Sequence, residues 1–138
     1  MNVTFAIEDG IGCIRLDGDG APRMADPEFT DLAALDAFLA REDLRGVVVT
    51  GAGRHFCGGA DLAPLAASLR DPEALGARLA RGKSLLQRLA TAPVPVVAAI
   101  RGQCLGGGLE IALACHFRVA ASGAMLGFPE SELGLLPG

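Results

Sequence analysis

The residues best placed to do chemistry are three consecutive glycines and the carboxylate that follows them, Gly106-Gly107-Gly108-Leu109-Glu110. The apolar segment 94–100 before them predicts a buried strand, and the apolar segment after them predicts a helix. Glycines permit a sharp turn and a close approach of the backbone, and the first N–H groups of a helix have no partner within it. Glu110 would lie within one turn of those N–H groups. This arrangement suits an oxyanion hole beside a catalytic acid or base.

A second glycine-rich loop, 51–61, directly follows another apolar segment, 46–50. That segment lacks polar alternation, which predicts a parallel strand buried on both faces. Sites in open α/β sheets form at the carboxyl ends of strands, so the two loops are expected to face each other across one crevice. Either loop alone is equally well explained as a tight connection. The pair, with Glu110 in the second loop, favours a functional site.

Other kinds of site fit the sequence poorly. The P-loop motif is absent, and the dinucleotide-binding motif is incomplete. His55 lies near Cys57, and His116 follows Cys115, but neither pair has further ligands at zinc-type spacing, so we expect no metal. Cys57 is either a nucleophile with His55 as its base or a small packed residue, and the absence of an orienting third group favours the second interpretation.

The sequence pattern alone leaves the roles of two glutamates undecided. Glu110, in its apolar segment, is either a solvated position or a buried functional acid. Glu130 follows Pro129 in a loop-like stretch, where an exposed loop acid would be the ordinary interpretation. Periodicity does not decide between these alternatives.

The elements that must position these residues form an α/β pattern in one domain. Asp9-Gly10 between two strand-like segments predicts a hairpin, and Asp26-Pro27-Glu28 is typical of a helix start. The expected elements are strands at 3–8 and 11–16, a helix at 26–41, a strand at 46–50, helices at 62–69 and 72–92, a strand at 94–100, a helix after the glycines, a strand at 117–121 and a short extended piece at 125–129.

Composition narrows the class of protein. With 51% hydrophobic residues over 138 positions, a substantial core is expected and disorder is not. A formal charge of −4 and only six aromatic residues argue against nucleic acid as a partner. No apolar run is long enough for a membrane span. Four cysteines without a CxxC pair, and an N-terminus unlike a secretory leader, predict a cytoplasmic protein with reduced thiols.

Four motifs in order resemble the enoyl-CoA hydratase/isomerase, or crotonase, superfamily. They are His55-Phe-Cys-Gly-Gly-Ala-Asp-Leu62, Pro95-Val-Val-Ala-Ala-Ile-Arg-Gly102, Leu105-Gly-Gly-Gly-Leu-Glu-Ile-Ala-Leu-Ala-Cys115 and Pro129-Glu followed by Leu133-Gly-Leu-Leu-Pro-Gly138. The resemblance implies an α/β, crotonase-like spiral of stacked ββα units, with one crotonase-like core domain over residues 1–138. Members of the family are longer, so their C-terminal helical part is expected to be missing from this chain.

The resemblance also implies a mechanism. It places an oxyanion hole for an acyl-CoA thioester at the backbone N–H groups of Ala60 and Gly107. Glu110 and Glu130 match the two catalytic carboxylates of family members that hold a water between them and add it to a 2-enoyl-CoA. Isomerases of the family usually rely on one carboxylate at the position of Glu130, so two glutamates favour an enoyl-CoA hydratase.

Further expectations follow from the same resemblance. Ala60, Asp61, Leu62 and Gly107 would bind the substrate, with Asp61 and Leu62 along its pantetheine arm. Coenzyme A belongs to the substrate and no other cofactor is expected. The C-terminal helices of the family build a homo-oligomer, a trimer or hexamer, once they are supplied. His116 replaces a frequent Asp, as in the hydratase part of multifunctional fatty-acid oxidation proteins. Isomerisation, thioester hydrolysis and a catalytically silent binding or assembly module remain the alternatives.

Overall fold

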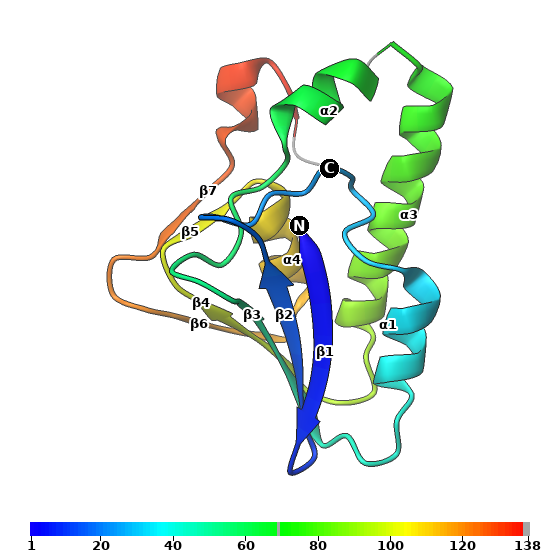
Figure 1. Ribbon diagram of the computed structural model, residues 1–138, viewed down its shortest axis with the longest axis vertical. Helices are drawn as coiled ribbons and strands as arrows, with labels where there is room; N and C mark the ends of the chain where they lie inside the picture. Colours follow the sequence, from blue (N-terminus) through cyan, green and yellow to red (C-terminus); the bar gives the residue numbers. More distant parts are fainter. Residues whose placement is uncertain (69, 137–138) are drawn as a thin grey trace.

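The computed structural model describes residues 1–68 and 70–136, which form an α/β structure with two sheets (Figure 1). The larger sheet has the strand order β1-β2-β3-β4-β6, and the smaller one pairs β5 with β7. The strands are β1 (Asn2–Glu8), β2 (Ile11–Asp17), β3 (Gly46–Gly51), β4 (Val96–Ile100), β5 (Gln103–Leu105), β6 (Phe117–Ala120) and β7 (Met125–Gly127).

The predicted hairpin is confirmed. β1 and β2 are antiparallel, and the two residues between them, Asp9 and Gly10, have positive φ angles of 49° and 78°. Positive φ at both central positions matches the turn that suits the twist of paired strands. From β2 onward each neighbour in the large sheet is parallel, through β3, β4 and β6. The carboxyl ends of β3 and β4, where both glycine-rich loops begin, therefore lie at one edge.

The helices gather around the face of the sheet that carries the core. They are α1 (Leu32–Leu39), α2 (Leu62–Ser68), α3 (Pro72–Ala90), α4 (Gly107–Ala114) and a 3₁₀ turn, η1 (Pro129–Leu133). Figure 1 shows α1 beside the C-terminal half of α3, and α2 at the N-terminal end of α3. Buried side chains of α1, α3 and α4, such as Leu35, Leu85 and Ile111, join those of β2, β3 and β4 in one core.

The expectation that 46–50 is buried on both faces is wrong. In β3, Val47 and Val49 are 1% and 0% exposed, whereas the alternate residues Val48 and Thr50 are only half-buried. The same alternation recurs in β4. It follows because the core lies on one face of the sheet, so only every second side chain points into it.

The predicted helix start at Asp26-Pro27-Glu28 is also wrong, because α1 begins at Leu32 with Asp31 as its N-cap. The Asp31 carboxylate accepts a hydrogen bond from the N–H of Ala34 at 2.8 Å. The Asp26 carboxylate instead accepts from the nearby N–H of Glu28 at 3.1 Å, which closes a local turn and competes with a helix. The segment 24–31 runs as a non-helical strap along α3.

The strap explains the glycine in the middle of α3. A side chain at Gly82 would place its Cβ only 2.8 Å from the carbonyl oxygen of Pro27, so the strap can lie against the helix only if residue 82 is glycine. The long helix predicted at 72–92 is confirmed, with its end at Ala90. The short helix predicted at 62–69 is confirmed as α2, and residue 69 lies outside the described residues.

The short extended piece predicted at 125–129 is confirmed in β7, but its parallel partner β5 was not predicted. A three-residue strand between glycines carries too little periodicity to be recognised from sequence. The helices among residues 1–68 and 70–136 include none long and apolar enough to cross a membrane.

Candidate active site

The two glycine-rich loops pack directly against each other at the carboxyl edge of the sheet. The N–H of Phe56 donates to the carbonyl of Arg101 at 2.8 Å, and the N–H of Cys57 donates to that of Gln103 at 3.0 Å. In return, the N–H of Leu105 donates to the carbonyl of Cys57 at 3.0 Å. The loops are thus joined by a short ladder of backbone hydrogen bonds, and the site lies beyond that ladder.

Arg101 and His55 fix the first loop from the side. The Arg101 guanidinium donates to the carbonyl oxygens of Gly53 and Gly51, at 2.6 and 2.7 Å. His55 Nδ1 accepts a hydrogen bond from the N–H of Gln103 at 3.0 Å. Both side chains therefore tie the loop after β3 to the end of β4.

The interpretation of Cys57 as a nucleophile activated by His55 is wrong. Cys57 is 0% exposed, and its side chain packs against Gly108, where a Cβ would lie 2.6 Å from that of Cys57. Burial raises the pKa of the Cys57 thiol, which disfavours the reactive thiolate. The small packed residue is the correct interpretation.

Backbone hydrogen bonds with Met24 hold the residues on either side of Ala60. On either side of it, the N–H of Met24 donates to the Gly59 carbonyl at 2.8 Å, and the N–H of Asp61 donates to the Met24 carbonyl at 2.7 Å. Among the described residues the N–H of Ala60 itself donates to no backbone carbonyl.

Gly107 is the first residue of α4, and Gly106 is its N-cap. The carbonyl of Gly106 accepts from the N–H groups of Leu109 and Glu110, at 2.8 and 3.0 Å, while the N–H of Gly107 finds no backbone partner in the described part of the chain. That is the expected state of the first N–H groups of a helix. Gly107 and Ala60 thus each present an N–H donor that has no backbone partner among the described residues.

The carboxylates approach this helix start from two elements. Glu110 is half-buried in the first turn of α4, and Glu130 is half-buried in η1. A Cβ at Gly106 would collide with Glu130 Oε1, so the carboxylate lies directly over that glycine. Glu130 Oε2 is buried and has no hydrogen-bond partner among residues 1–68 and 70–136. Glu130 is therefore not the exposed loop acid that its local sequence suggested.

The two N–H donors and the two carboxylates line one cavity of about 340 Å³, which lies between α3, α4 and the strap. Of the predicted site residues, Ala60, Asp61, Gly107, Glu110 and Glu130 line it. Leu62 lies outside the lining, exposed at the start of α2. The remaining lining is mainly apolar and was not predicted as part of the site: Met24, Ala25, Pro27, Phe29, Leu65, Leu75, Leu79, Gly82, Leu86, Ile111, Leu135 and Leu136, with Arg78 and Lys83.

The spacing of the leucines in α3 is the one sequence signal that could have identified this apolar lining. Leu75, Leu79, Leu86 and Leu89 recur at helical spacing, which predicts one apolar face. In the structure Leu85 and Leu89 enter the core, whereas Leu75, Leu79 and Leu86 face the cavity. Across the described residues, no three His, Cys, Asp or Glu side chains come together as metal ligands.

Comparison with known proteins points to one family. The family model for enoyl-CoA hydratase/isomerase matches residues 11–138. The chain is 35% identical over 137 residues to a probable enoyl-CoA hydratase of Bacillus subtilis (strain 168), covering 99% of this chain and 53% of that protein. It is 40% identical to the fatty acid oxidation complex subunit alpha of Shewanella frigidimarina, covering 100% of this chain and 21% of that one.

A solved structure agrees with the fold. The enoyl-CoA hydratase from Polaromonas sp. JS666 superimposes with a TM-score of 0.88 at 31% identity, over 99% of this chain and 54% of that one. The chain therefore spans about half the length of the hydratases it matches.

Proposed function

Because the chain belongs to the enoyl-CoA hydratase/isomerase family, we propose that the protein adds water across the 2,3 double bond of a 2-enoyl-CoA thioester. The observation that carries this proposal is the meeting, on one cavity, of two carboxylates and two N–H donors that have no backbone partner in the described part of the chain. Hydration needs both the N–H donors and the carboxylates. Negative charge develops on the thioester oxygen, where the donors act, while a water is deprotonated, where a carboxylate acts.

In the proposed mechanism the N–H groups of Ala60 and Gly107 bind the thioester oxygen. As water adds, that oxygen takes up the charge of an enolate-like intermediate. Donors already fixed by the backbone stabilise this charge without reorganising, and losing one such donor typically costs about 10²–10³ in rate. Two fixed backbone donors on one cavity support this assignment.

Glu110 and Glu130 would hold the attacking water between them. One glutamate, as a carboxylate, takes a proton from the water as the water oxygen bonds to the β-carbon, and the other, as a carboxylic acid, gives its proton to the α-carbon. The buried Oε2 of Glu130 supports this role, because a buried acceptor without a partner is uncommon unless a ligand or water completes it. The apolar walls would receive the acyl chain, and Asp61 and Leu62 would lie along the pantetheine arm.

A homo-oligomer, a trimer or hexamer formed once the C-terminal part of the family fold is supplied, is part of the same proposal. Phe117 and Val119 of β6 are 60% and 64% exposed, and Met125 of β7 is 57% exposed. Neighbouring apolar side chains exposed to this degree typically mark a surface that another polypeptide covers.

The test is hydration of crotonyl-CoA by the purified protein. The reaction is monitored by the loss of ultraviolet absorbance as the conjugated thioester is consumed. We expect Glu110→Gln and Glu130→Gln each to lower kcat by about 10²-fold or more. Glu132→Gln, on the exposed side of η1, is the matched control and should leave kcat unchanged.

Unchanged hydration in either of the first two variants would contradict the proposed roles. Product analysis separates the alternatives, because an isomerase yields a shifted double bond and a hydrolase releases free coenzyme A. A silent module would show no turnover and little binding of acyl-CoA.

A further inference from the structure

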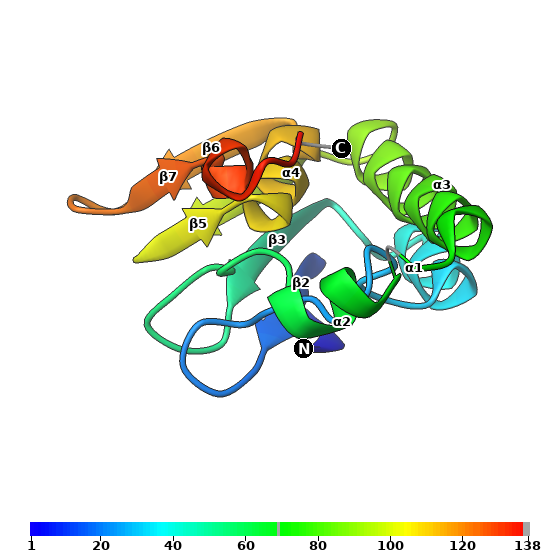
Figure 2. The ribbon, with the colours of Figure 1, turned by 90° about the horizontal axis from the view of Figure 1, so that it is seen from above.

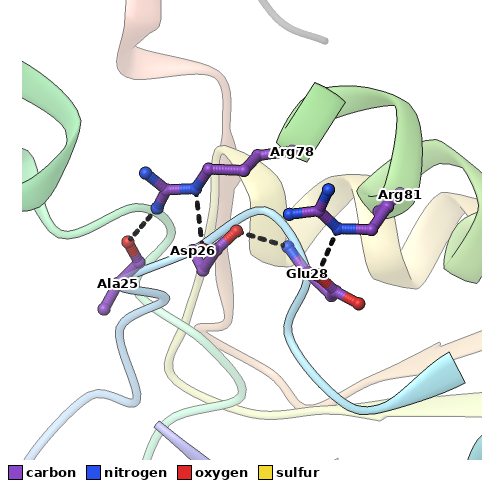
Figure 3. Close-up of polar contacts among 5 residues, drawn as sticks. All are labelled: Ala25, Asp26, Glu28, Arg78 and Arg81. Atoms are coloured by element: carbon purple, nitrogen blue, oxygen red, sulfur yellow. Dashed lines mark hydrogen bonds and ion pairs between the residues drawn. The ribbon is translucent and has the colours of Figure 1, made fainter. Parts of the chain in front are cut away.

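Helix α3 carries four cations, and three of them are arginines that pair with carboxylates. Figure 3 shows Arg78 and Arg81 reaching the strap. The pairs are Arg78 Nε with Asp26 Oδ2 at 2.7 Å, Arg81 Nε with Glu28 Oε2 at 2.6 Å, and Arg88 Nε with Asp36 Oδ1 at 3.1 Å. These three charges are thereby matched within the fold.

The fourth cation, Lys83, is the single lysine of the sequence. It is exposed, and in the described part of the chain no acidic group pairs with it. Lys83 nevertheless lines the cavity, together with Leu79 and Leu86 of the same helix face. The apolar cavity thus has one unmatched positive charge on its wall.

The position of Lys83 along α3 indicates which part of a ligand it would meet. Asp61 and Leu65 lie on or next to α2, at the N-terminal end of α3 (Figure 2). Leu75 lines the cavity near that end, and Lys83 follows it by about 12 Å along the axis, at 1.5 Å per residue. If the pantetheine arm follows Asp61, then Lys83 lies toward the far end of the acyl chain.

We infer that Lys83 selects acyl-CoA ligands whose acyl chain ends in a carboxylate. This inference rests on the proposed function and adds the substrate class. A carboxylate in an apolar cavity is costly unless it is paired. The other charged groups of the lining do not offer that pairing, since Arg78 is already bound to Asp26 and the remaining three are acidic: Asp61, Glu110 and Glu130.

The test compares binding of adipoyl-CoA and hexanoyl-CoA to the purified protein by isothermal titration calorimetry. These two ligands have the same chain length and differ in the terminal carboxylate. Because both acyl chains are saturated, neither can be hydrated, and binding is measured without turnover. We expect adipoyl-CoA to bind about five-fold more tightly, the upper range for a partly exposed ion pair. In Lys83→Met the order should reverse, because the carboxylate would enter the cavity unpaired. Lys83→Arg should retain the preference.

Arg88→Met is the matched control, since it removes one cation from the same helix outside the cavity. It should leave the ratio of the two dissociation constants unchanged. Equal affinities in the unaltered protein would overturn the inference while leaving the proposed function intact. An equal loss of both affinities in Lys83→Met would overturn it too, and would assign Lys83 to the phosphates of coenzyme A. Failure of both ligands to bind would contradict the proposed function itself.

Discussion

The carboxylate of Glu130 lies against the Cα of Gly106, the residue that caps α4 and precedes the proposed donor Gly107. The first glycine of the triplet therefore does more than allow a turn. Its lack of a side chain leaves the space that brings Glu130, from a distant 3₁₀ turn, to the start of α4. Gly106 also has a φ of 51°, which a residue with a Cβ adopts at a cost.

Gly106→Ala should therefore lower the kcat of hydration by about 10²-fold or more, because the methyl group displaces the Glu130 carboxylate and strains the start of α4. The measurement is kcat with crotonyl-CoA, alongside circular dichroism to verify folding. Gly76→Ala is the matched control, since nothing lies within 4 Å of a Cβ there. Full activity of a folded Gly106→Ala protein would show that the contact does not position Glu130.

The two interior glycines of α3 should respond oppositely to the same substitution. Gly76→Ala should raise the free energy of unfolding by about 0.5–1 kcal/mol, because alanine is the better helix former and the site is open. Gly82→Ala should lower it by about 1–3 kcal/mol, since the Cβ would strike the strap at Pro27. Urea denaturation measures both. A stabilised Gly82→Ala protein would mean that the strap does not lie against α3 as described.

The ion pairs of the strap should differ in strength. The pairs differ mainly in their arginines: Arg78 is 25% exposed and its partner Asp26 38%, whereas Arg81 is 50% exposed and its partner Glu28 28%. We expect a double-mutant cycle of Arg78→Met and Asp26→Ala to give a coupling energy of about 1–2 kcal/mol, and the cycle for Arg81 and Glu28 about 0.5 kcal/mol. Equal coupling in both cycles would show that burial does not strengthen the first pair.

Alkaline pH should destabilise the fold through its buried thiols. Burial raises the pKa of Cys104 and of Cys115 to about 12, from an ordinary value of 9.0. Between these values the unfolded chain has lost protons that the native chain retains, so the free energy of unfolding falls as pH rises. Each such thiol contributes at most about 1.4 kcal/mol per pH unit.

Urea titrations at several pH values above 9.0 measure this dependence, and Cys115→Ala should make it shallower. A slope unaffected by Cys115→Ala would place its thiol in contact with water.

Local pattern was sufficient for the elements that have a clear period or turn signal. The Asp9-Gly10 hairpin and α3 are confirmed because the turn and the helix depend on residues close in sequence. The helix start at Asp26 was predicted wrongly because two aspartates compete as caps, and contacts between the strap and α3 decide which one succeeds.

By itself, the sequence determined the family, the order of most elements and the identity of Ala60, Gly107, Glu110 and Glu130 as candidates, since motifs and periods are local. Only the tertiary structure decided that these four share one cavity, that Cys57 is core, and that Leu75, Leu79 and Lys83 form its wall. The physical reason is that burial and proximity depend on how the strap, α3 and η1 pack against α4. Those contacts join residues far apart in the chain, and local pattern does not contain them.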